Sequence, residues 1–157
     1  MRLLVSACLL GVCCRYDGQA KPDERVLALL KEHILVPVCP EQLGGLPTPR
    51  CPCEIREGRV ISRDGTDRTA EYRKGAAEAL RLARLFSCEA AVLKARSPSC
   101  GAGQVYDGAF TGTLWAGNGV TAGLLIRSGV PVYTEENLPE DFAEEAFAAC
   151  YPETTGS

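Results

Sequence analysis

Short apolar runs alternate with amphipathic stretches along this chain. Each apolar run is bounded by polar or turn-forming residues and predicts a buried β-strand; the runs cover residues 2–7, 34–38, 89–94 and 130–133. The stretches between them carry apolar residues at helical spacing and predict helices over 23–33, 66–86 and 120–128. Strands that alternate with helices predict an α/β protein, a single-domain three-layer Rossmann-like fold with a mainly parallel sheet.

The helical spacing also predicts which side chains face the core. In the first helix, Val26, Leu29 and Leu30 share one face. The long helix has a larger set of inward candidates, which comprises Tyr72, Ala76, Ala79, Leu80, Ala83 and Leu85.

Two segments are dense in proline and glycine and predict loops. Residues 39–54 carry four prolines and two glycines, and residues 95–112 follow the third strand. Between the two, residues 55–62 predict a hairpin around Glu57-Gly58, or a flap over a site. A final amphipathic helix is expected over 139–149. One domain would then span 1–150, with a loose tail over 151–157.

Three cysteines follow apolar strands, in the segments LLVSAC, ILVPVC and AAVLKARSPSC. If the strands are parallel, Cys8, Cys39 and Cys100 meet beyond the carboxyl ends of the strands, where open α/β sheets bind their ligands. Thiolates suit zinc, copper(I) and iron–sulfur clusters. The spacing alone does not choose among these, and it leaves a redox or nucleophilic thiol and plain burial open as well.

Polar residues beside these cysteines are candidates for chemistry and binding. A carboxylate in the crevice suits acid–base work, a serine offers donors and acceptors, and glycines let the backbone approach a ligand. From the residues alone, Glu41 is a candidate for acid–base work or a solvated loop carboxylate, and Ser97 and Ser99 are candidates to line an anionic or sulfide pocket. The candidates for substrate binding are Arg15, Tyr16, Lys94 and Gly101.

Composition narrows the function classes. A net charge of −3 and a pI near 5.3 argue against binding duplex nucleic acid by neutralising phosphates, and they favour a substrate smaller than tRNA. His33 is the single histidine, which weakens any Ser-His-Asp hydrolase. We expect neither a signal peptide nor a membrane segment, and with nine cysteines we therefore expect a reducing, cytoplasmic location.

Several ordered motifs together resemble one known family. SACLLG, CRYDG, VPVCPEQLGGLPTPR, DGTDRT, LKARSPSCG, YDG and GVTA resemble the bacterial domain family associated with thiouracil and thiouridine desulfidases, over about residues 2–133. The resemblance implies a 4Fe-4S cluster held by Cys8, Cys39 and Cys100, with the fourth iron open to the sulfur of a thiolated pyrimidine. It also implies Glu41 as the acid–base group and Ser99 as the serine, with Ser97 as the alternative.

The implied activity is non-redox hydrolytic cleavage of a carbon–sulfur bond in thiouracil, thiouridine or its nucleotide. Cys14 matches the family motif, whereas Cys13, Cys51 and Cys53 stand where other residues are expected. The alternatives are a non-catalytic metal-binding or sulfur-carrier module and a thiol oxidoreductase.

Overall fold

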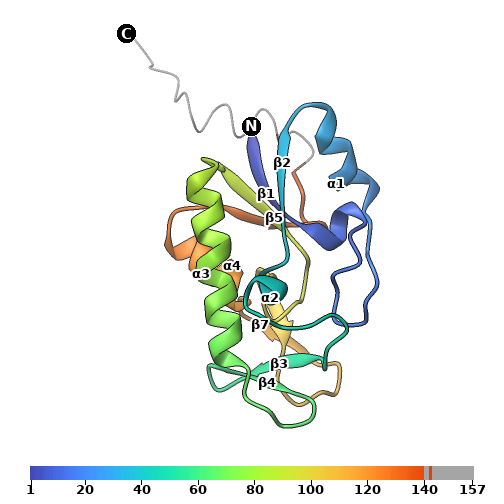
Figure 1. Ribbon diagram of the computed structural model, residues 1–157, viewed down its shortest axis with the longest axis vertical. Helices are drawn as coiled ribbons and strands as arrows, with labels where there is room; N and C mark the ends of the chain where they lie inside the picture. Colours follow the sequence, from blue (N-terminus) through green and yellow to red (C-terminus); the bar gives the residue numbers. More distant parts are fainter. Residues whose placement is uncertain (140–141, 143–157) are drawn as a thin grey trace.

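Four parallel strands form the central sheet of the computed structural model, which describes residues 1–139 and 142 (Figure 1). They are β1 (Arg2–Ser6), β2 (Ile34–Val38), β5 (Ala90–Leu93) and β8 (Val132–Thr134), in the order β2-β1-β5-β8. Strands β1 and β5 are buried along almost their whole length, as expected of a parallel sheet covered on both faces. The predicted α/β fold with a mainly parallel sheet is confirmed.

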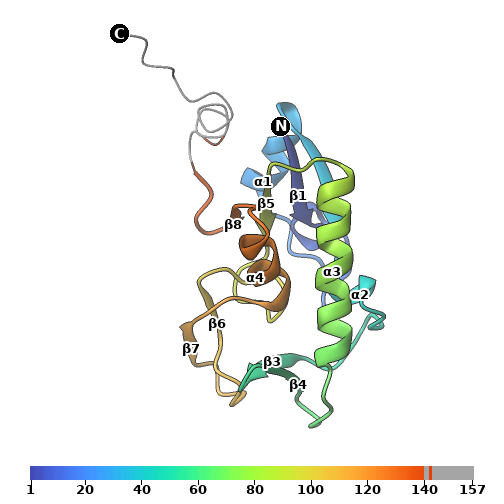
Figure 2. The same ribbon diagram turned by 90° about the vertical axis from the view of Figure 1, so that its left-hand side faces the viewer.

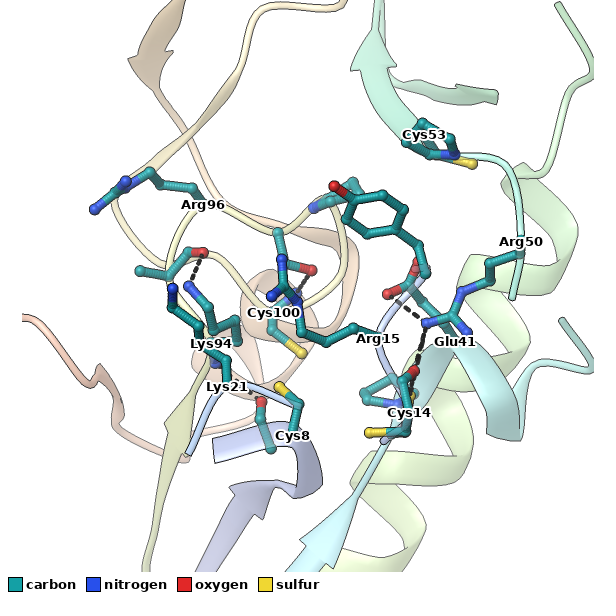
Figure 3. Close-up of a pocket in the computed structure, with 18 of the residues that line it drawn as sticks. Cys8, Cys14, Arg15, Lys21, Glu41, Arg50, Cys53, Lys94, Arg96 and Cys100 are labelled. Carbon is teal, nitrogen blue, oxygen red and sulfur yellow. Dashed lines mark hydrogen bonds and ion pairs between the residues drawn. The ribbon is translucent and has the colours of Figure 1, made fainter. Parts of the chain in front are cut away.

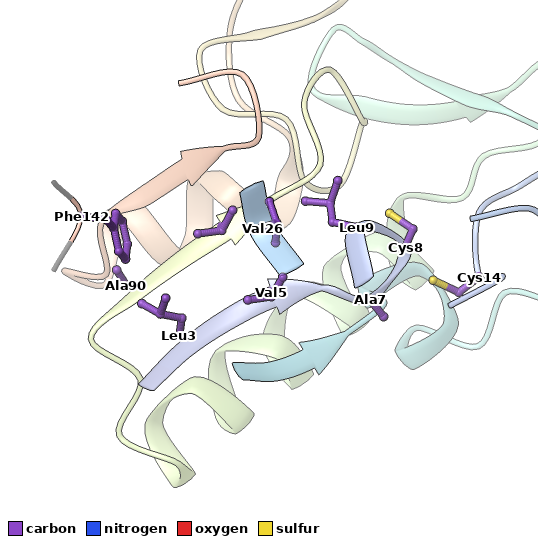
Figure 4. Close-up of a cluster of buried hydrophobic side chains, with 10 residues drawn as sticks. Leu3, Val5, Ala7, Cys8, Leu9, Cys14, Val26, Ala90 and Phe142 are labelled. Atoms are coloured by element: carbon purple, nitrogen blue, oxygen red, sulfur yellow. The ribbon is translucent and has the colours of Figure 1, made fainter. Parts of the chain in front are cut away.

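Alternate residues of β1 face opposite layers. Leu3 and Val5 pack with Val26 of α1 (Glu24–Ala28), in the cluster that Figure 4 draws. Leu4 packs in the opposite cluster, which includes residues of α3 (Thr69–Leu85) and α4 (Val120–Arg127). Figure 2 shows α1 and α3 on opposite sides of β1, so the sheet lies between two helical layers.

Some elements differ from the prediction. The predicted hairpin exists, but it begins two residues earlier, with β3 (Cys53–Arg56) and β4 (Arg59–Ser62). The segments predicted as loops also hold a short helix, α2 (Pro40–Leu43), and the strand β6 (Gln104–Tyr106), which pairs in a second hairpin with β7 (Leu114–Ala116), just beyond the predicted loop. The loop prediction was wrong there because proline suits the first turn of a helix, and because three-residue strands are too short to show alternation.

Two predicted core residues are exposed. Leu30 is 57% exposed because α1 ends at Ala28 and gives way to a 3₁₀ turn, η2 (Leu29–Lys31), which changes the side-chain direction. Leu85 is 66% exposed and is the last residue of α3. The other predicted inward residues of α3 are buried, as is Val26, while Leu29 is half-buried.

Helices α2 and α3 touch backbone to backbone. A Cβ on Gly44 would lie 2.0 Å from the carbonyl oxygen of Glu71, and one on Gly75 would lie 1.9 Å from that of Pro40. Only glycine permits this approach, and it fixes the segment that follows Cys39 against α3.

Gly75→Ala is therefore expected to destabilise the fold. Alanine favours a helix over glycine by about 1 kcal/mol, but a clash with a backbone carbonyl costs about 3 kcal/mol, so we expect a net loss of about 2 kcal/mol. Urea unfolding of the variant and of the unmodified chain measures this loss in the free energy of unfolding. The control is Gly117→Ala, where a new Cβ would make an ordinary 3.4 Å contact with Val105 and should change stability by less than about 0.5 kcal/mol. Equal losses of stability in Gly75→Ala and Gly117→Ala would contradict a clash between the new Cβ of residue 75 and the Pro40 carbonyl.

No helix within residues 1–139 and 142 is long and apolar enough to cross a membrane. The helix expected over 139–149 falls almost entirely outside the described residues, and the tail over 151–157 falls wholly outside them.

Candidate functional site

A cavity of about 500 Å³ opens at the carboxyl ends of the sheet strands. Its lining includes all three predicted cysteines. Figure 3 labels two of them, Cys8 and Cys100. Cys8 lies in a 3₁₀ turn after β1, η1 (Ala7–Leu10), Cys39 directly follows β2, and Cys100 lies in the turn region after β5. The parallel topology thus gathers three sulfurs that are far apart in sequence.

The turn that carries Cys100 is held from two sides. The Ser97 hydroxyl oxygen accepts the backbone N–H groups of Ser99 and Cys100, both at 3.1 Å. The first N–H groups of α4 point at the same turn, since Val120 donates to the Pro98 carbonyl and Thr121 to the Ser99 carbonyl, both at 2.9 Å. This turn therefore takes the place of a side-chain cap on α4.

The two candidate serines have different surroundings. Ser97 lines the cavity. Ser99 is 1% exposed, is not part of the cavity lining, and shares a 2.8 Å hydrogen bond with Thr121. The hydroxyl of Ser99 is thus directed into the packing between the turn and α4.

A fourth thiol, Cys14, lies between two of the predicted ligands. A hydrogen bond with Cys39 acts to lower the pKa of Cys14, but a hydrogen bond with Cys8 and burial outweigh it and raise the pKa to about 11. The contact with Cys14, together with burial, raises the pKa of Cys39 well above its ordinary value. Burial raises the pKa of Cys100 to about 12. Without a bound metal these thiols are neutral, so metal binding there would displace their protons.

Glu41 projects from α2 to the cavity wall, and each of its two carboxylate oxygens has a partner in the protein. Oε2 lies 3.3 Å from a guanidinium nitrogen of Arg50, and Oε1 accepts a hydrogen bond from the Tyr72 hydroxyl. The carboxylate is thus fixed beside the cysteines.

Arg50 connects separate parts of the site. Its side chain is 4% exposed, and one guanidinium nitrogen lies 2.9 Å from the Cys14 carbonyl oxygen and 4.0 Å from the Cys39 sulfur, as well as near Glu41. Burial acts to lower the pKa of Arg50, but Glu41 outweighs it and the pKa is raised, so Arg50 stays charged. One cation thereby links the loop after β1 with the segment after β2.

Three of the four predicted substrate-binding residues line the cavity, and the fourth, Gly101, does not. Arg15 and Tyr16 both line the cavity, and the Arg15 guanidinium lies 5.7 Å from the centre of the Tyr16 ring. Lys94 lines it too, with its amino group 3.3 Å from a carboxylate oxygen of Glu135. Gly101 is outside the lining; a Cβ there would lie 2.8 Å from the Ser97 carbonyl oxygen, so this glycine serves the packing of the turn.

The donor set can be tested against the metal centres that thiolates bind. The eight cysteines within the described residues are all free. In that same part of the chain, no three His, Cys, Asp or Glu side chains are arranged to hold a single metal ion. A zinc ion needs its sulfurs about 2.3 Å from one centre, whereas a cluster binds each cysteine through a different iron and spaces them more widely. The chemistry of the donor set, several thiols that line one cavity, suits a thiolate-bound centre, and iron–sulfur clusters are among the centres that thiolates hold.

Arg50 and Tyr72 are two site residues that the sequence pattern did not predict. Arg50 is the last residue of the PTPR motif. The motif contributed to the family resemblance, but it gave no sign that the Arg50 side chain lies at the site. Tyr72 was predicted as a core residue, and it is buried, but its hydroxyl reaches the site. No local pattern signals such a contact.

Comparisons with a family model, a curated protein and a solved structure each give a match over most of the chain. The family model described as 2-thiouracil desulfurase matches residues 3–137. The uncharacterized protein YbbK of Bacillus subtilis (strain 168) is 41% identical over 146 residues, which cover 87% of this chain and 97% of that protein. The solved structure of the [4Fe-4S]-dependent thiouracil desulfidase TudS is 44% identical with a TM-score of 0.86, over 93% of this chain and 98% of that one.

Proposed function

Since the chain belongs to the 2-thiouracil desulfurase family, we propose that it removes sulfur from thiolated pyrimidines with a 4Fe-4S cluster held by Cys8, Cys39 and Cys100. The observation that carries this proposal is the meeting of these cysteines and Glu41 in one cavity. The similarity to a [4Fe-4S]-dependent thiouracil desulfidase supports the choice of cofactor.

The proposed reaction exchanges a thiocarbonyl and water for a carbonyl and hydrogen sulfide, with no net transfer of electrons. When bound, a cluster with three protein ligands supplies a Lewis-acidic iron with a position open to sulfur. Glu41 takes a proton from the attacking water and returns it to the departing sulfur, because its carboxylate is at the cavity wall beside the cysteines. Buried Arg50 and Tyr72 hold that carboxylate in place.

We assign the serine of the site to Ser97 in preference to Ser99. The Ser97 hydroxyl oxygen already accepts two backbone N–H groups, so its own hydrogen remains for a group bound in the cavity. Ser99 lies outside the cavity lining and hydrogen-bonds Thr121 and the buried thiol of Cys100, so its hydroxyl is engaged within the protein.

The charge of the cavity favours a nucleotide over a free base. Among the described residues, the lining contains two glutamates, Glu41 and Glu54, and six basic side chains, Arg15, Lys21, Arg50, Arg63, Lys94 and Arg96. Four of these basic side chains form ion pairs, Arg50 with Glu41 and three with acidic residues outside the lining (Arg15 with Asp17, Lys94 with Glu135, Arg96 with Glu136). Lys21 and Arg63 form no ion pair within the described residues, and they would attract a phosphate group. Arg15 and Tyr16 offer charge and an aromatic face to a planar base. The 500 Å³ cavity suits a nucleotide, and tRNA is the less favoured substrate.

Anaerobic turnover of three substrates tests the proposal. Iron-loaded protein is mixed with 2-thiouracil, 4-thiouridine or 4-thiouridine monophosphate, and the released sulfide and the loss of thiocarbonyl absorbance are measured. We expect equal amounts of sulfide and oxo-pyrimidine from at least one substrate, and the highest kcat/KM, falling with added salt, for the monophosphate. Iron-loaded protein that releases no sulfide from any of the three would favour the metal-binding or sulfur-carrier module, and a colourless zinc protein would overturn the cluster.

A further inference from the structure

Tyr72 is a buried residue whose hydroxyl contacts Glu41 of the cavity wall. It lies on α3, is 2% exposed, and donates its hydroxyl hydrogen to Oε1 of Glu41. The same hydroxyl forms a hydrogen bond with the thiol of Cys53, at the start of β3. It therefore connects α2, α3 and the first hairpin at one atom.

The surroundings of Tyr72 make it a fixed donor. Its ring packs in a buried cluster with Leu46, Cys53 and Val60. Burial, reinforced by the negative charge of Glu41, raises the pKa of Tyr72 far above its ordinary value, so the hydroxyl keeps its proton. A rigid, permanently protonated phenol is suited to orient a carboxylate rather than to exchange protons with it.

The same face of α3 also fixes the backbone that carries Glu41. Gly75, one helical turn after Tyr72, lies against the Pro40 carbonyl with no room for a Cβ. Pro40 stands between Cys39 and Glu41 in the chain, so α3 holds this segment by its backbone at Gly75 and by the Glu41 side chain at Tyr72.

A carboxylate has about four lone-pair positions, and Tyr72 and Arg50 occupy one on each oxygen of Glu41. We propose that Tyr72 is a positioning residue, whose hydroxyl orients the Glu41 carboxylate so that its remaining lone pairs face the reacting water in the cavity. This inference rests on the proposed function.

Tyr72→Phe tests the inference, since it removes one oxygen and keeps the ring in its cluster. We expect kcat to fall about 10- to 100-fold, because a misdirected acid–base group loses alignment, while KM, iron content and visible absorbance stay the same. In a Glu41→Gln background, Tyr72→Phe should have no further effect, because it acts through Glu41.

Val60→Ala is the matched control. It removes packing from the same cluster but no polar group, so it should lower the unfolding temperature and leave kcat unchanged. A Tyr72→Phe protein with the kcat of the unmodified chain, or with an equal loss in the Glu41→Gln background, would overturn the positioning role.

Crystal structures of the unmodified chain and of Tyr72→Phe separate this inference from the proposed function. We expect the Glu41 carboxylate to rotate or to take more than one conformer in the variant, whether or not the protein turns over a thiolated pyrimidine. An unchanged carboxylate would refute the positioning role, whereas an inactive but iron-loaded unmodified chain would refute only the function.

Discussion

Cys100→Ser is expected to give a folded protein that holds little or no iron. Cys100 is 5% exposed, and its turn is fixed by Ser97 and by the start of α4, which together hold this thiol in place at the cavity. A serine hydroxyl is a poor ligand for iron in a cluster that prefers thiolate. Iron and labile sulfide analysis of anaerobically prepared protein should find about four of each in the unmodified chain and close to none in the variant.

The matched control is Cys88→Ser. Cys88 is half-buried, follows α3, and lies outside the cavity lining, so its loss should leave the iron content unchanged. Circular dichroism of both variants checks that they fold. Full iron in Cys100→Ser, or an equal loss in both variants, would exclude Cys100 as a specific ligand.

Glu41→Gln is expected to keep the iron and to lose about 10²- to 10⁴-fold in kcat, the range that a general acid–base group contributes. Glutamine has nearly the same shape, but it cannot carry a proton between water and the departing sulfur. The measurement is sulfide release under substrate saturation, together with the visible absorbance of the cluster.

The same substitution should also cost stability, since it leaves the buried guanidinium of Arg50 without its ion-pair partner. A loss on the order of 3 kcal/mol is expected, so turnover must be measured well below the unfolding temperature of the variant. Glu78→Gln, on α3 and outside the cavity, is the control and should match the unmodified chain in both respects. Normal turnover by Glu41→Gln would remove Glu41 from the mechanism.

The regular parts of the fold were predictable because their signals are local. The apolar runs at β1, β2 and β5 and the helical spacing of α3 each lie within one short window of sequence. The two wrong predictions of buried side chains, Leu30 and Leu85, have local causes too. A 3₁₀ turn redirects Leu30, and α3 ends at the exposed Leu85.

The candidate site was predictable only in part. That Cys8, Cys39 and Cys100 share a cavity follows from parallel strands, whose carboxyl ends lie at one edge of the sheet. The choice between Ser97 and Ser99 did not follow, because both belong to the same short motif. The contact of Ser99 with Thr121, 22 residues away, is what separates their surroundings.

The sequence by itself therefore determined the α/β class, the family motifs and the three cysteines at one edge of the sheet, since periodicity and strand order carry that information. The tertiary structure alone decided which polar groups surround the cysteines. Tyr72 meets Glu41 across 31 residues, and Arg50 meets the Cys14 carbonyl across 36. Such contacts depend on the packing of α2 against α3 and of one loop against another, and no repeating pattern in the chain records them.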